Sequence, residues 1–316
     1  MIKQNDYKAS EHRNIARPLI VAFSVIMATG SLGFANANSK DKSKTEAVEK
    51  ILNQTHPCSD TIVIRSQALS KAQQENTCRL LAKQESRFHQ LFLTRNKPVR
   101  HDLNTSLRVN VYHSRDDFVK HAASHFNMPT DNGGMYLEGF PDQTGNQAEF
   151  ITYQKGDVIW NLQHEYVHYL DGRFNLYGDF CDSLHDSHSP PENCAKPAPL
   201  FPHTTWWTEG IAEYIAKGDS HPRAFDAVNN DKNQYQLSEL FDTGYLKNGG
   251  GTRVYFWGYF AARFMMEQER DKVESMLTFL REGDFPRYQA LIRSWGTSMD
   301  QKFEQWLKAL LSIESE

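Results

Sequence analysis

The chain has 316 residues and lacks several features that would indicate other classes of protein. It has no long run of basic residues and a formal net charge of −4, so nothing in its charge suggests nucleic acid as a partner. It shows no internal repeat, so a repeat architecture is not expected. It has only 4 cysteines, and none of them has the C-x-x-C spacing that is typical of a cysteine-bound zinc site.

Long apolar runs are also scarce, and only one segment is apolar enough to cross a membrane. Residues 18–35 are mostly apolar or small, follow a basic stretch and lead into an A-x-A cleavage site at Ala35-Asn36-Ala37. A retained membrane anchor is the alternative, but glycines near the end of the segment and the cleavage site favour removal. We therefore expect residues 1–37 to be a signal peptide and the mature chain to be secreted, without membrane attachment.

The cysteines fall as two close pairs. In an exported protein an even number of cysteines suggests disulfides, and pairing of near neighbours is the simplest of the three connectivities. The sequence therefore predicts Cys58–Cys78 and Cys181–Cys194 disulfides. Zinc binding by these cysteines is the less favoured alternative because of their spacing.

One short motif suggests chemistry. The five residues from His164 to His168 read HEYVH, within an apolar stretch that Asp157 can cap and Gly172 can end as a helix. Histidines four apart project from one face of a helix and can bind one metal ion, while Glu165 can reach a water on that metal. A surface helix with two histidines is the alternative, which the apolar surroundings disfavour.

A third ligand follows further along the chain. Glu209 and Glu213 are four residues apart on a second apolar helix, where two unpaired carboxylates would repel each other and resist burial. Both problems ease if Glu209 binds the metal and Glu213 accepts the outer N–H of a ligand histidine. Two histidines, one glutamate and an open fourth position are typical of a catalytic zinc site.

The stretches around these residues resemble a known family. HEYVHYLDGRF at residues 164–174 and WWTEGIAEY at residues 206–214 are similar to the peptidase domain of bacterial, Vibrio-type microbial collagenases of peptidase family M9. The likeness extends through residues 132–138, 145–150 and 184–188. The resemblance implies a glutamate-ligated zincin with one catalytic zinc ion.

The elements expected along the chain form an α+β pattern, which agrees with the zincin fold implied by the resemblance. We expect a small mixed sheet, an edge strand over the H-E-x-x-H helix and a mostly helical C-terminal half. The domains would be a linker or solvated helix at residues 38–57 and a peptidase domain at 58–316. Strands are expected at 107–112, with one buried face, 135–138 and 148–153. Further helices are expected at 66–92, 116–126, 206–216, 238–241, 255–269, 273–282, 285–294 and 299–311.

Several finer roles rest on the resemblance. Gly133 and Gly134 would lie on the edge strand that binds an extended peptide, although a plain turn is an equal alternative. Glu138 matches a calcium ligand of the family, with carbonyls from residues 172–178 completing that site; an ordinary strand-end carboxylate is the alternative. Tyr255 matches a residue that helps line the active site and could donate a hydrogen bond to the developing oxyanion, unless it belongs to an aromatic core helix.

The function expected is zinc-assisted peptide hydrolysis by a monomer, with Glu165 as general base. Full-length family members carry a large activator domain before the peptidase domain, whereas about twenty mature residues precede Cys58 here. Denatured collagen and Gly- and Pro-rich peptides are therefore the expected substrates. A catalytically idle peptide-binding protein is an alternative, which the intact His164, Glu165, His168 and Glu209 set disfavours. A secreted endopeptidase of other specificity is a third hypothesis.

Overall fold

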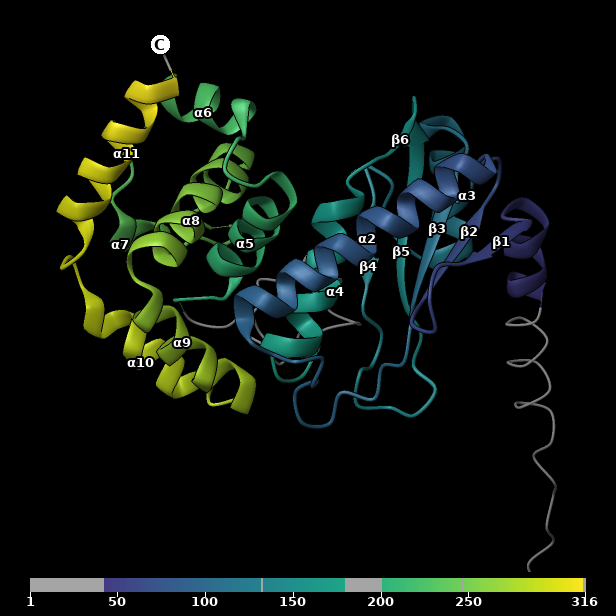
Figure 1. The fold of residues 1–316 in the computed structure, drawn as a ribbon, viewed down its shortest axis with the longest axis horizontal. Helices are drawn as coiled ribbons and strands as arrows, with labels where there is room; N and C mark the ends of the chain where they lie inside the picture. The colour runs from purple at the N-terminus through teal and green to yellow at the C-terminus, as the bar shows by residue number, and fades with distance from the viewer. Residues whose placement is uncertain (1–42, 132, 180–200, 246, 315–316) are drawn as a thin grey trace, which may run out of the picture. The chain divides into compact units, whose positions relative to one another are not determined.

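The fold combines a mixed β-sheet with a helical C-terminal half (Figure 1). The computed structural model describes residues 43–131, 133–179, 201–245 and 247–314, and from Lys44 onward the chain forms one compact unit. Its strands are β1 (Gln54–Pro57), β2 (Ile62–Ser66), β3 (Leu107–Tyr112), β4 (Met135–Leu137), β5 (Ala148–Lys155) and β6 (Val158–Ile159). Its helices are α2 (Lys71–Phe92), α3 (Arg115–Phe126), α4 (Leu162–Asn175), α5 (Thr205–Lys217), α6 (Pro222–Asn229), α7 (Leu237–Leu240), the π-helix η1 (Thr252–Trp257), α8 (Gly258–Gln268), α9 (Arg270–Glu282), α10 (Phe285–Trp295) and α11 (Asp300–Glu314).

The strand order places β4 at an edge of the sheet. The order is β1-β2-β3-β5-β4, with β6 pairing to the end of β5. β2, β3 and β5 are parallel to one another, whereas β1 and β4 run antiparallel to their neighbours. The sheet is therefore mixed, as expected from the sequence, and within the described ranges one side of β4 has no neighbouring strand.

Helices cover both faces of this sheet. On one face Tyr112 and Ile151 pack in a core with α3, and on the other Val109 and Phe150 join the larger core that includes α2, α4 and α5. Successive side chains of a strand point to opposite faces, so a strand covered on both sides is buried along its whole length. The expectation of one buried face for residues 107–112 was therefore wrong, since Asn110 and Tyr112 are fully buried as well.

The helix that carries the H-E-x-x-H motif has different ends from those expected. It begins at Leu162, after a cap at Asn161, and not after Asp157. Gly156, with a φ of 61°, allows a tight turn after β5, so the next residues pair back onto β5 as β6. The helix continues through Gly172, where a side chain would approach the Glu138 carboxylate to within 3.0 Å.

Other segments also differ from the expectation. β1, β2 and α6 were not expected, and residues 54–57, assigned to a linker or solvated helix, form an edge strand. The helix expected from residue 66 begins at Lys71, because Ser70 and Gln73 form a capping box there. Residues 252–257, expected in part as regular helix, form η1, and π-helical turns are often found at functional sites.

A disulfide joins Cys58 to Cys78 and so links the segment after β1 to α2. The ring spans a sequence separation of 20, for which the stabilisation is on the order of 3 kcal/mol. The expected Cys181–Cys194 pair lies outside the described residues. Within the described part of the chain, none of the helices has the length and apolar character needed to cross a bilayer.

The closest approach between α5 and α8 yields a stability prediction. A Cβ added at Gly210 would lie 2.3 Å from the main-chain oxygen of Gly258, and main-chain atoms cannot move aside cheaply. We expect Gly210→Ala to lower the free energy of unfolding by about 1–3 kcal/mol, despite the higher helix propensity of alanine. Gly251→Ala is the control, because that glycine has a φ of −56° and open space around its Cβ direction. Equal urea midpoints for the two variants would contradict the prediction.

Candidate metal centre and substrate cleft

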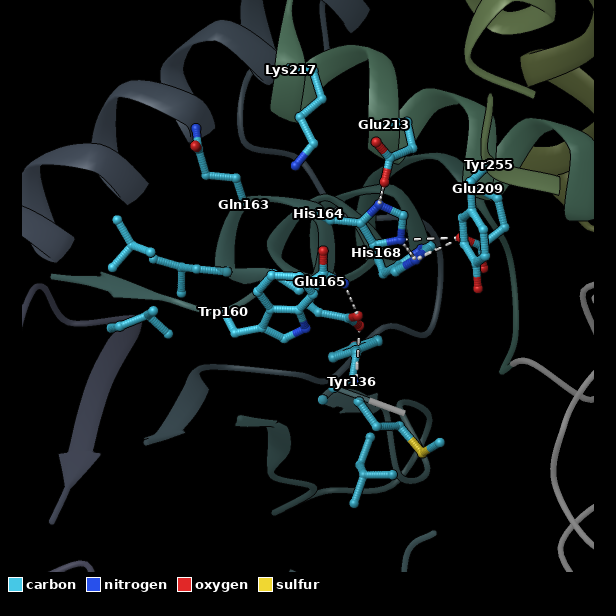
Figure 2. A pocket seen from close by; sticks show the side chains of 18 of the residues that line it. Tyr136, Trp160, Gln163, His164, Glu165, His168, Glu209, Glu213, Lys217 and Tyr255 are labelled. Carbon is cyan, nitrogen blue, oxygen red and sulfur yellow. Dashed lines mark hydrogen bonds and ion pairs between the residues drawn. The ribbon is translucent and has the colours of Figure 1, made fainter. Parts of the chain in front are cut away.

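A cleft with a volume of about 1320 Å³ opens between β4, β6, α4, α5 and η1. It is lined by all four residues of the expected zinc and base set, His164, Glu165, His168 and Glu209 (Figure 2). These residues come from two helices, α4 and α5, that pack against each other. The four side chains expected to carry chemistry therefore line one cleft.

The two histidines and Glu209 converge on one point. The Nε2 atoms of His164 and His168 are 2.9 Å apart, and Glu209 Oε2 lies 3.1 Å from the first and 3.6 Å from the second. Zinc binds nitrogen at about 2.0–2.1 Å and carboxylate oxygen at about 2.0–2.2 Å, so one ion can contact all three atoms. Among the described residues, this is the one group of three or more potential metal-binding side chains.

The charges of this cluster suit a cation. Burial alone would raise the pKa of Glu209, but His168 and His164 lower that pKa well below its usual value. Burial would likewise lower the pKa of His164, yet its contacts with Glu209 and Glu213 raise it well above its usual value. Without a metal, a proton on His164 therefore balances the carboxylates, and a metal ion replaces that proton on binding.

Glu165 lies beside the cluster and is held at both oxygens. Asn161 Nδ2 donates to Oε1 at 2.8 Å, and the main-chain N–H of Tyr136 in β4 donates to Oε2 at 3.1 Å. Burial raises the pKa of Glu165 above its usual value, although the nearby histidines and Asn161 oppose this rise. A fixed carboxyl group with a raised pKa is suited to exchange protons. Asn161 was not expected to contact Glu165.

Glu213 contacts a ring nitrogen of His164 that faces away from Glu209. Its Oε1 lies 2.9 Å from His164 Nδ1, and its Oε2 lies 2.9 Å from Nε2 of His221. Burial would raise the pKa of Glu213, but these two histidines lower it strongly. His221 was not expected, because it is separated from the motifs and has no neighbouring pattern that distinguishes it.

Two tyrosines complete the wall around Glu209. Tyr255, in η1, lines the cleft with its ring centroid 6.0 Å from that of His164. The charge of Glu209, with burial, raises the pKa of Tyr255, so its phenol stays protonated and can donate a hydrogen bond. Tyr245, which was not expected, donates from its hydroxyl to Glu209 Oε1.

The double glycine lines the cleft and packs tightly against its neighbours. A Cβ at Gly133 would lie 2.0 Å from Nε1 of Trp160, and one at Gly134 would lie 3.0 Å from the main-chain oxygen of Ile151. Both glycines therefore allow close packing against Trp160 and β5, in addition to lying next to the edge strand. Trp160 lines the cleft, and Lys155 Nζ lies 3.9 Å from the centroid of its ring, which is close enough for a cation–π interaction.

Glu138 lies away from this cleft. It is buried, and its main-chain oxygen accepts a 2.8 Å hydrogen bond from Asn146. The segment expected to supply calcium-binding carbonyls, residues 172–178, is helical as far as Asn175, because α4 is longer than expected. The Glu138 carboxylate therefore lies against the last turns of α4 at Gly172, and not against a free loop.

Comparison with known proteins finds one matching family and several similar proteins. The family model described as Collagenase, of peptidase family M9, matches residues 33–306. Microbial collagenases of Vibrio alginolyticus and Vibrio parahaemolyticus are 42% and 37% identical to the chain, over 85% and 87% of its length. A collagenase of Clostridium tetani is 23% identical over 70% of the chain.

The matched region is a part of each of these relatives. It covers 31% of the Vibrio alginolyticus protein, 32% of the Vibrio parahaemolyticus protein and 21% of the Clostridium tetani protein. The family match nevertheless spans most of the chain and includes every residue of the buried cluster. The chain therefore belongs to the collagenase family, peptidase family M9.

Proposed function

We propose that the chain is a secreted zinc metalloendopeptidase of the zincin type that hydrolyses Gly- and Pro-rich, collagen-derived peptides. The observation that carries this proposal is the buried His164, His168 and Glu209 cluster with Glu165 held beside it. Family membership supports the reaction type, and the printed names of the relatives support collagen as the substrate class.

The residues fit a catalytic zinc ion. Two imidazoles and one carboxylate leave room for a water and a substrate carbonyl, in contrast to a closed structural site. When bound, zinc would supply Lewis-acid polarisation of the carbonyl and a water with a pKa near 7. Glu209 would contribute one negative charge to the ion, and Tyr245 holds the other carboxylate oxygen of Glu209 in place.

The proton transfers are assigned to Glu165. Its carboxylate takes a proton from the attacking water and then delivers it to the leaving amine. Asn161 and the main chain of Tyr136 fix the Glu165 carboxylate in one orientation, which lowers the entropy cost of the proton transfer. Tyr255 lines the same cleft as a neutral phenol and can donate a hydrogen bond to the developing oxyanion.

The substrate is assigned to the edge of β4 that lies away from β5. An extended peptide can add to an edge strand through main-chain hydrogen bonds, and this strand borders the cleft in contact with Glu165. Extended Gly- and Pro-rich chains suit such binding because they are already near the required conformation. Calcium binding at Glu138, extracellular location and a monomeric state belong to the same proposal. The end of the signal peptide at residue 37 and the start of the peptidase domain after residue 57 are also part of it.

A catalytically idle peptide-binding protein is the second candidate. The edge strand favours it, since strand addition alone binds peptides. The two hydrogen bonds that fix Glu165 disfavour it, because a binding protein has no need of a positioned base.

Replacement of the base separates these two candidates. We expect Glu165→Gln to retain about one zinc ion per chain but to lower kcat about 10²–10⁴-fold, because glutamine cannot accept the proton. Metal analysis and peptide cleavage provide the two readouts, and His168→Ala, which removes a ligand, is the control that loses the metal. A Glu165→Gln protein that binds zinc and cleaves at the wild-type rate would exclude Glu165 as the base.

Asn161 provides a test of how the base is positioned. This residue has a φ of 56°, so Asn161→Gly removes the side chain without straining the main chain. We expect kcat to fall about tenfold with KM nearly unchanged, because one hydrogen bond to a charged group is lost. Asn248→Gly is the matched control, since Asn248 also has a positive φ, of 55°, and lies outside the cleft lining. The same kcat in both variants would refute the role of Asn161.

Substrate class can be tested with three substrates and a zinc chelator. We expect chelator-sensitive cleavage of a Gly-Pro-rich peptide and of gelatin, and much slower cleavage of native collagen, whose three wound chains offer no single free strand to β4. A peptide with alanine in place of proline serves as the matched control. Equal rates on both peptides would favour an endopeptidase of other specificity, and no cleavage with zinc bound would favour the binding protein.

A further inference from the structure

A continuous line of contacts runs from the metal cluster to a residue outside the recognised motifs. His164 Nδ1 lies 2.9 Å from Glu213 Oε1, and the other oxygen of that carboxylate lies 2.9 Å from His221 Nε2. All three side chains are buried, with exposed fractions of 3%, 8% and 5% respectively. His221 is therefore the third member of a line that ends at a metal-binding nitrogen.

The chemistry of a carboxylate decides which atom carries hydrogen in these two contacts. An ionised carboxylate can only accept, so both histidine nitrogens that face Glu213 must carry hydrogen. With hydrogen on Nδ1, the neutral ring of His164 directs the lone pair of Nε2 toward Glu209 and His168. The tautomer of this ring that can bind a metal thus depends on the orientation of the Glu213 carboxylate.

The surroundings of His221 hold its own ring in place. Its main-chain oxygen accepts the N–H groups of Ala224 and Phe225 at the start of α6, at 2.8 and 3.1 Å. The rings of Phe256 and Tyr259 pack against its imidazole edge-to-face, with centroids 5.7 and 5.1 Å away. A ring fixed by main chain on one side and by aromatic rings on others can hold a neighbouring carboxylate in one rotamer.

We propose that His221 is a positioning residue that fixes the Glu213 carboxylate and so prepares His164 to bind the metal ion. The inference rests on the proposed zinc site. It assigns to α6 and to the aromatic residues of η1 and α8 a role in metal affinity, although none of them contributes a ligand. Removal of a hydrogen-bonded partner behind a ligand histidine typically lowers metal affinity about 10–100-fold.

Two substitutions that differ by one methylene test the position of the donor. The amide nitrogen of glutamine can reach the place of His221 Nε2, whereas that of asparagine is too short to do so. In the full chain, we expect His221→Asn to lower zinc affinity about tenfold, measured by competition with a chromogenic chelator. His221→Gln should stay within about threefold of the wild type. His125→Asn is the matched control, because His125 is buried and hydrogen-bonded to Tyr112 but lies outside the cleft lining.

A double variant shows whether the effect passes through Glu213. In a Glu213→Ala background, His221→Asn should cause no further loss of zinc affinity, because the intermediate carboxylate is absent. At saturating zinc, kcat and KM of His221→Asn should return close to wild-type values. The proposal would be overturned if His221→Asn also lowered zinc affinity about tenfold in the Glu213→Ala background, or if His221→Gln lowered it as much as His221→Asn does. Wild-type affinity in His221→Asn would also overturn it.

The outcome can be separated from that of the proposed function. If the wild-type chain binds no zinc, the proposed function fails together with this inference. If the wild type binds zinc and cleaves peptide while His221→Asn does both with unchanged affinity, only the role of His221 fails. A rise in KM at saturating zinc, with unchanged zinc affinity, would instead assign His221 to the substrate-binding wall of the cleft, and would overturn its role behind the metal.

Discussion

The site depends on the packing of α4 against α5, which holds His164 and Glu209 in contact although 45 positions separate them in the sequence. Burying two carboxylates costs free energy unless each one has partners, and here each carboxylate faces two histidine nitrogens. The core and the candidate metal centre are thus held together by the same packing. Gly210 has a part in this, because its missing side chain lets α8 pack closely behind α5.

The sheet contributes the second half of the site. β4 borders the cleft, and its main chain contacts Glu165, so the strand assigned to the substrate and the base assigned to the reaction are directly connected. Asn161 occupies the junction between β6 and α4, with a left-handed main-chain conformation. Its side chain does not cap the helix but donates to Glu165. The Asn161 side chain thus contacts Glu165, the proposed base, in place of a capping hydrogen bond to the first turn of α4.

Much of the site could be predicted, because its ligands have short, regular spacings. Four residues separate His164 from His168, and Glu209 from Glu213, and a helix converts that spacing into a shared face. His221, Tyr245 and Asn161 could not be predicted in this way. Their roles arise from contacts with residues on other elements, or from a main-chain turn, and no local period reports such contacts. The short β1 and β2 strands were missed for a related reason, since a few residues give too little period to recognise.

The sequence by itself determined the α+β class and the residues able to bind a metal, and it favoured the Cys58–Cys78 pairing. Those features follow from residue type and spacing along the chain. Only the tertiary structure decided which carboxylate oxygen faces which histidine, that β4 contacts Glu165, and that His221 stands behind Glu213. The physical reason is that hydrogen bonds in a buried site are set by the packing of α4, α5 and α6 in three dimensions, and many sequences with the same local pattern could pack these helices differently.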